Sequence, residues 1–210
     1  ISSAASDVYK RQDLKNLKTL WDLITMVNLQ YNDWKGKLWR QIKADTLIDQ
    51  NKNFSTQTKG VPKEVRILKG CQALTEKVQN MNTVLNLVES LRAEFMEDRH
   101  WKQLKDKTRS DFDHKSSTFS FDDILKLKLY KIKAEVEEIV DIAQKESKID
   151  KKLKIIESNW AKQVFEFETY KENYIFLPLD EMMEILDANS LDLMGMKAQG
   201  KYVEFFIETV

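Results

Sequence analysis

Glu97-Asp98-Arg99-His100-Trp101-Lys102-Gln103-Leu104 is the segment of this chain that indicates its fold most clearly. Trp101 and Leu104 are three positions apart, so a helix places them on the same face, and Asp98 and Lys102 have the spacing of an i,i+4 ion pair. The segment therefore predicts a charged helix with one apolar side.

Helical periodicity extends outward from this segment through most of the chain. Apolar residues recur at spacings of three and four over residues 14–42 and again over residues 62–91. A long helix is predicted over about residues 130–163, which at 1.5 Å per residue would be about 50 Å long. Asp180 is expected to cap a last helix whose inward side chains would be Met183, Leu186, Leu191 and Met194.

Three segments interrupt these helices and are candidates for bending. They are Gly60-Val61-Pro62, the polar connection over residues 108–120, and residues 146–150, where a bend or an exposed segment is expected. The polar connection is predicted to be the most mobile, and Ser120 is expected to cap the helix that follows it. Alternating residues near 164–177 predict one short β-hairpin that turns at Lys171-Glu172-Asn173.

Composition supports a helical fold. The 210 residues are 42% hydrophobic and 10% aromatic, with 5 Gly and 2 Pro, so the fold class is mainly α: an elongated bundle of long helices with one short hairpin. Lys and Arg number 34 and Asp and Glu number 34, which predicts no nucleic-acid or membrane surface. Cys71 is the only cysteine, so no internal disulfide is possible.

Four tryptophans fall on apolar helix faces and are predicted to be core anchors: Trp21, Trp34, Trp101 and Trp160. Trp39 lies one position off its apolar stripe, beside Leu38. It is therefore the candidate for an outward-facing contact.

Gly195-Met196-Lys197-Ala198-Gln199-Gly200-Lys201-Tyr202 is close to a phosphate-binding P-loop. A P-loop places Ser or Thr where Tyr202 stands and follows a buried strand, whereas residues 181–194 have helical periodicity. The favoured interpretation is a helix end at Gly200. With two histidines and one cysteine, no familiar zinc-ligand spacing occurs, so no catalytic, cofactor-binding or metal-binding residue is predicted.

Residues 1–12 do not fit the helix that follows. They resemble a translated sequencing adapter, and we treat them as a non-native leader that has no place in the fold.

Asp98-Arg99-His100-Trp101 resembles a signature of the linker region (N-terminal region 2) of dynein heavy chains, especially the axonemal type. Three other blocks resemble the same region in the same order: Leu20–Leu23 with Asp33-Trp34 and Leu38-Trp39, then Ala134–Val140 with Lys151–Leu153 and Trp160, then Phe165–Phe167 with Tyr170-Lys171. The resemblance implies that Asp98, Arg99, His100 and Trp101 are a structural signature. It also implies that residues 13–210 are part of a linker domain, with helical subdomains over about 13–107 and 120–210.

A dynein linker is a mechanical part and not a catalytic one. The resemblance implies that the chain transmits ATP-driven change of the AAA+ ring of the same polypeptide into movement along a microtubule, in the cytoskeleton of a cilium or flagellum. ATP and Mg²⁺ would bind elsewhere in the parent chain, and other dynein subunits and the microtubule would be contacted by other regions. The alternative is a freestanding helical interaction module of the spectrin-like or coiled-coil type. A nucleotide-binding enzyme built on residues 195–202 is a weaker rival.

Overall fold

A computed structural model describes residues 2–164, 166–176 and 180–209, with side chains from residue 9 onward and without those of residues 175 and 176. The chain forms two compact units, Ile1–Val140 and Asp141–Val210. Their boundary falls inside a helix, and the connection over residues 108–120 belongs to the first unit. The predicted subdomains, divided at that connection, therefore differ from the observed units.

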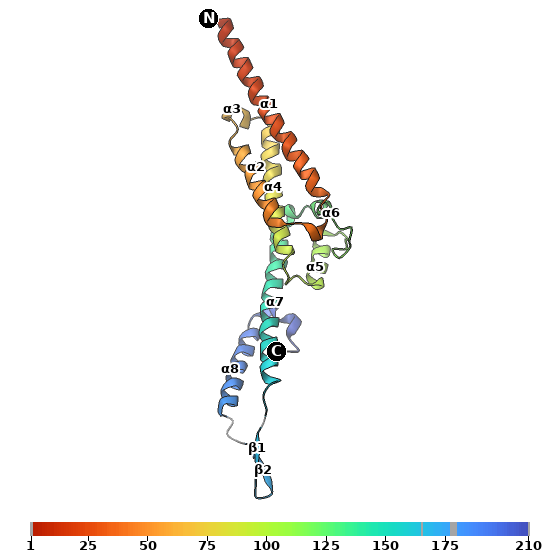
Figure 1. The fold of residues 1–210 in the computed structure, drawn as a ribbon, viewed down its shortest axis with the longest axis vertical. Helices are drawn as coiled ribbons and strands as arrows, with labels where there is room; N and C mark the ends of the chain where they lie inside the picture. The colour runs from red at the N-terminus through yellow and green to blue at the C-terminus, as the bar shows by residue number, and fades with distance from the viewer. Residues whose placement is uncertain (1, 165, 177–179, 210) are drawn as a thin grey trace. The chain divides into compact units, whose positions relative to one another are not determined.

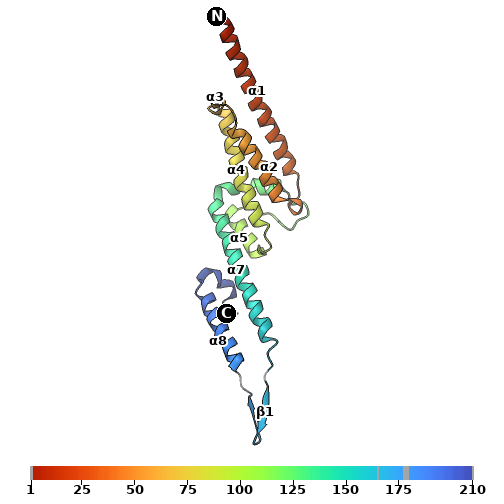
Figure 2. The same ribbon diagram turned by 60° about the vertical axis from the view of Figure 1, so that its left-hand side comes forward.

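The named elements of the first unit, over its described residues, are all helices (Figure 1). Helices α2 and α4 lie side by side in both views, and α1 runs next to them (Figures 1 and 2). The elements are α1 (Ser2–Lys35), η1 (Trp39–Gln41), α2 (Ala44–Lys59), α3 (Lys63–Arg66), α4 (Lys69–Leu91), α5 (Asp98–Thr108), α6 (Phe121–Lys126), η2 (Leu129–Ile132) and the beginning of α7 (Lys133–Trp160).

A buried polar network joins the three longest packed helices of this unit. The Tyr31 hydroxyl of α1 donates a hydrogen bond to Oδ1 of Asn51 in α2 at 2.5 Å. The Asn51 amide in turn donates to the carbonyl of Val78 in α4 at 3.1 Å. Asn51 is fully buried, so these two bonds offset the cost of removing its amide from water.

The second unit contains the end of α7, strands β1 (Phe167–Tyr170) and β2 (Asn173–Phe176), helix α8 (Asp180–Lys197) and the short turns η3 (Gly200–Tyr202) and η4 (Glu204–Phe206). Its core is small and consists of Ile149, Leu153, Met196, Val203 and Phe206.

The antiparallel hairpin confirms the predicted one. Tyr170 pairs with Asn173, which leaves a two-residue loop at Lys171 and Glu172. Both loop residues have positive φ, 46° and 70°, as the tight hairpin turn of this type requires. The sequence did not suggest so short a turn, because Asn and Gly usually occupy those positions.

Helix starts follow local chemistry. Ser120 and Asp123 form a capping box at the start of α6, in which the Ser120 amide donates to the Asp123 carboxylate at 3.0 Å. This bond and the Ser120 hydroxyl lower the pKa of Asp123. The cap predicted at Ser120 is therefore confirmed.

Two expectations about helices were wrong, those for residues 146–150 and for the inward face of α8, and one helix forms where the apolar pattern is weak. Residues 44–59 form the regular helix α2, although their apolar pattern is weak; tertiary packing against α4 outweighs that pattern. Residues 146–150 lie within an unbroken α7, where Glu146 and Ile149 are buried. The side chains expected to face inward on α8 are exposed: Met183, Leu186, Leu191 and Met194.

The tryptophans divide differently from the prediction. Trp34 and Trp101 are buried, Trp160 is partly exposed, and Trp21 is 64% exposed, so the expectation that Trp21 is a core anchor was wrong. Trp21 lies on α1 outside the face that packs on α2 and α4. Trp39 is only 8% exposed, so its predicted outward-facing role was wrong as well.

Residues 2–12, which we set aside as a leader, are part of helix α1. Their origin stays a prediction. No helix in the described part of the chain is both long enough and apolar enough to cross a bilayer.

Candidate functional site

The signature residues Asp98 to Trp101 form the first turn of α5. The backbone amide of Glu97 donates a hydrogen bond to Nδ1 of His100 at 3.1 Å, and the Glu97 side chain accepts from the His100 amide. This reciprocal capping box satisfies amide groups that a helix start leaves without partners. His100 is fully buried, and accepting through Nδ1 requires that this nitrogen carry no proton.

Trp101 is the centre of an aromatic cluster. Its ring meets Trp39 edge-on, with centroids 5.7 Å apart and planes at 89°, and stacks on His114 at 4.4 Å and 8°. Phe112 meets Trp101 at 6.2 Å, and Phe119 meets Trp39 at 5.9 Å. Edge-to-face and stacked pairs of this kind each contribute about 0.5–1.5 kcal/mol beyond their buried area. We call these five residues the Trp101 cluster.

Asp98 carries the polar side of the same site. Its carboxylate binds Nζ of Lys115 at 2.5 Å and lies 3.6 Å from Nε2 of His114. The Lys115 hydrogen bond holds the pKa of Asp98 below its ordinary value. Arg99 forms an ion pair with Glu97, so it stabilises the start of the helix.

The signature therefore fixes the connection over residues 108–120 to the rest of the first unit. Phe119 is buried, its carbonyl accepts from the Trp39 amide at 2.8 Å, and the Phe121 amide donates to the Lys37 carbonyl at 2.9 Å. Arg40 donates to the Lys115 carbonyl at 2.8 Å. The connection is polar in composition, yet it is held at both ends and in the middle.

Sequence reasoning missed four residues of this site: Trp39, Phe112, His114 and Phe119. One signal was present, since Phe112 and His114 are two positions apart and an extended chain places such residues on one side. Asp98 and Trp101 contact residues of the connection over residues 108–120. His100 and Arg99 instead contact Glu97 at the start of α5. Aromatic contacts of Trp101 and ion pairs of Asp98 hold the connection against α5. This arrangement is consistent with a structural signature.

The P-loop-like segment is a helix end. Gly195 lies within α8, and Gly200 has a φ of +60° just after it, as the favoured interpretation expected. The Tyr202 hydroxyl donates to Asp141 at 3.1 Å, and Nζ of Lys145 lies 4.1 Å from the Tyr202 ring centroid. Lys145 also donates to Asp141 at 2.9 Å, which lowers the pKa of that carboxyl group.

The acidic residues of the connection are engaged in local contacts. Asp111 forms an ion pair with Lys105 at 3.3 Å, and Asp113 accepts from the Lys115 amide at 2.9 Å. Over the described ranges, no group of three or more His, Cys, Asp or Glu side chains has the arrangement of a metal site.

Comparison with known proteins shows similarity over nearly the whole chain. Residues 9–210 match the family described as dynein heavy chain, N-terminal region 2. The dynein alpha chain of the flagellar outer arm of Chlamydomonas reinhardtii is 33% identical over 201 residues, and the beta chain of the same arm is 36% identical over 204 residues. Dynein axonemal heavy chain 17 of Mus musculus is 33% identical over 201 residues.

Each of these alignments covers 95% of this chain but only 4% of the relative. The chain thus spans a small part of the length of the proteins that it matches.

Proposed function

Because this chain belongs to the dynein heavy chain family, within N-terminal region 2, we propose that it is a mechanical linker segment of an axonemal dynein. In this proposal it transmits ATP-driven change of the AAA+ ring of the same polypeptide into movement along a microtubule in a cilium or flagellum. The observation that carries the proposal is the family match over residues 9–210, together with relatives named as axonemal and flagellar dynein chains.

The local structure suits a part that transmits force. Helix α1 has 34 residues and α7 has 28 without an interruption; at 1.5 Å per residue, α7 is about 40 Å long. Continuous backbone hydrogen bonding resists bending, whereas bending concentrates where few such bonds exist. The connection over residues 108–120 is such a place, and the Trp101 cluster packs it against α5 and so limits bending there.

The proposal assigns catalysis to other parts of the parent chain. ATP and Mg²⁺ would bind in the ring, and contacts with the microtubule and with other dynein subunits would come from regions outside these 210 residues. The segment itself would contribute stiffness and a surface for the ring.

A helix-breaking substitution in the parent motor tests this role. Gln144 is an exposed position within α7, and proline there removes one backbone hydrogen bond and costs about 3 kcal/mol or more of helix stability. We expect Gln144→Pro to reduce microtubule gliding velocity severely while the ATP turnover of the motor persists. Gln144→Ala, which keeps the helix, should glide at the parent velocity.

Unchanged gliding by Gln144→Pro, with the helix break verified by hydrogen exchange, would refute the mechanical role.

A further inference from the structure

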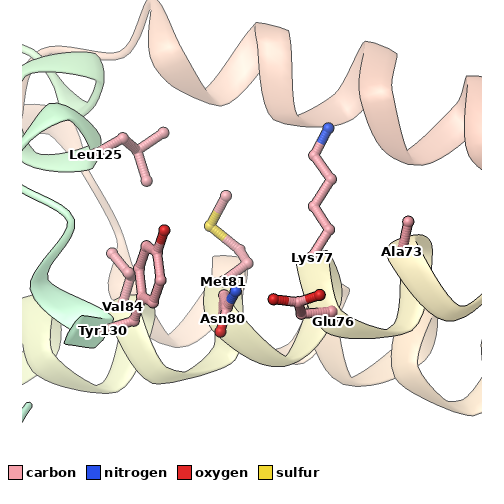
Figure 3. A pocket seen from close by; sticks show the side chains of 8 residues that line it. All are labelled: Ala73, Glu76, Lys77, Asn80, Met81, Val84, Leu125 and Tyr130. Carbon is pink, nitrogen blue, oxygen red and sulfur yellow. The ribbon is translucent and has the colours of Figure 1, made fainter.

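A groove lies on the first unit between α4 on one side and α6 and η2 on the other (Figure 3). Its volume is about 280 Å³, close to the lower limit of about 300 Å³ for typical small-molecule sites, so it suits one or two side chains better than a large ligand. We call it the α4–α6 groove. Its lining residues are Ala73, Glu76, Lys77, Asn80, Met81, Val84, Leu125 and Tyr130.

One end of the α4–α6 groove is apolar. Met81 and Val84 of α4 are buried, and Leu125 and Tyr130 are partly buried against the main core. Figure 3 shows the Met81 thioether, the Leu125 side chain and the Tyr130 ring around the same space. Methionine adapts its shape readily to a bound apolar group. This end can therefore accept an apolar side chain.

The other end carries a positive charge without an anionic partner. Lys77 extends from α4 toward α1 (Figure 3), donates to Asn28 Oδ1 at 2.6 Å, and lies 5.8 Å from the Tyr31 ring centroid. Among the described residues, no carboxylate lies within ion-pair distance of Lys77. Partial burial, followed by the charge of Lys35, lowers the pKa of Lys77, and a nearby anion would favour its charged form.

Further polar groups of the groove match a peptide. The Tyr130 hydroxyl makes no hydrogen bond within the described part of the chain and points into the space beside Leu125 (Figure 3). Glu76 and Asn80 offer acceptor oxygens on the α4 side. A peptide has both amide donors for these oxygens and carbonyls for Tyr130, whereas a simple carboxylate lacks the amide donors. The Glu76 carboxylate can accept a backbone N–H of the peptide, while the peptide's own carboxylate would bind at Lys77.

We propose that the α4–α6 groove binds an acidic, apolar peptide segment of a protein partner, with its apolar side chain between Met81 and Leu125 and its carboxylate at Lys77. All residues that line the groove lie in the first unit. The proposal is argued from these residues alone and does not depend on the mechanical role proposed above.

The test is a nuclear magnetic resonance titration of the full 210-residue chain. The probe is the blocked peptide acetyl-aspartyl-leucyl-alanine amide, and the comparison ligands are its asparaginyl analogue and hexanoate. We expect saturable shifts confined to residues around the groove, with the peptide binding more tightly than either comparison ligand. Lys77→Met should weaken peptide binding about tenfold, the effect of losing one hydrogen bond to a charged group.

Two further variants separate binding from folding. Lys69→Met removes a charge from α4 outside the groove and should bind the peptide as the parent chain does. Tyr130→Phe removes only the hydroxyl and should weaken binding about threefold. Equal binding by Lys77→Met and the parent, or shifts spread over the whole surface, would overturn the proposal. Hexanoate binding as tightly as the peptide would replace the peptide with a small carboxylate and overturn the partner assigned here.

Discussion

The Trp101 indole and the His114 imidazole lie face to face, with their centroids 4.4 Å apart and their planes at 8°. Trp101 lies in the first turn of α5 and His114 in the polar connection over residues 108–120. The stack therefore joins a helix to a polar segment that the sequence did not predict to pack against it. His114 also faces charged groups: the carboxylate of Asp98 at 3.6 Å, and the charges of Lys115, Asp113 and Lys105.

The His114 environment predicts a pH dependence of stability. Burial lowers the pKa of His114 below its ordinary 6.5, and Asp98 opposes this shift only in part. The unfolded chain therefore takes up a proton more readily than the folded chain, so the contribution of His114 is complete above 6.5 and is lost as the pH falls from there toward the folded pKa. Urea unfolding at about pH 7.5 and about pH 5.5 should show lower stability at the lower pH.

The matched control is His114→Phe, which keeps a ring against Trp101 but does not titrate. Its stability should fall less between the two pH values than that of the parent chain. Asp98 does not affect this window, because its pKa is lowered from 3.8 and its contribution is lost only at more acidic pH. An identical pH dependence in both chains would assign the effect to another group.

Burial predicts opposite outcomes for two tryptophans. Trp101 is 4% exposed and Trp21 is 64% exposed. Trp101→Ala should lower the free energy of unfolding by about 3–5 kcal/mol, because it leaves a cavity in the aromatic cluster. Trp21→Ala should change it by no more than about 0.5 kcal/mol. Urea denaturation measures both, and a large loss in Trp21→Ala would show that its exposed position is wrong.

Hydrophobic periodicity correctly predicted the helices and strands that depend only on the sequence of their own segment. Helices α3 and α4 lie within residues 62–91, where helical spacing was predicted, and α5 begins one residue after Glu97. The hairpin lies where alternation placed it, and Ser120 caps α6. Each of these depends on spacing within one segment or on a cap beside it.

What periodicity could not give is the side of a helix that meets another helix. The apolar stripe on α1 is wide, so the sequence predicted that both Trp21 and Trp34 are buried. Only Trp34 is buried, and its ring contacts Phe54 of α2. Helix α2 has a weak apolar pattern of its own, and its stability comes from packing against α4. In the candidate site, the signature turn was recognised, whereas its partners Phe112, His114 and Phe119 lie in a segment whose polar neighbours concealed them.

Hydrogen exchange should resolve the connection over residues 108–120 into fixed and free parts. The sequence predicted this segment to be the most mobile, but the Phe121 amide donates to Lys37 and the Trp39 amide donates to Phe119. We expect these two amides to exchange slowly, as the amides of α7 do, and the amide of Ser117 to exchange fast, since Ser117 is exposed. Fast exchange at Trp39 and Phe121 would restore the original hypothesis for the whole segment.

The buried network around Asn51 predicts the effect of removing a single hydroxyl. Tyr31→Phe keeps the ring against Trp34, 5.0 Å away, but it deprives Oδ1 of Asn51 of its donor in a fully buried position. A buried acceptor left without a partner costs about 1–3 kcal/mol, so the free energy of unfolding should fall by that amount. Tyr130→Phe is the control, because that hydroxyl makes no hydrogen bond in the described part of the chain, and it should change stability by less than about 0.5 kcal/mol. Equal urea midpoints for the two variants would mean that the Tyr31–Asn51 bond does not stabilise the junction of α1, α2 and α4.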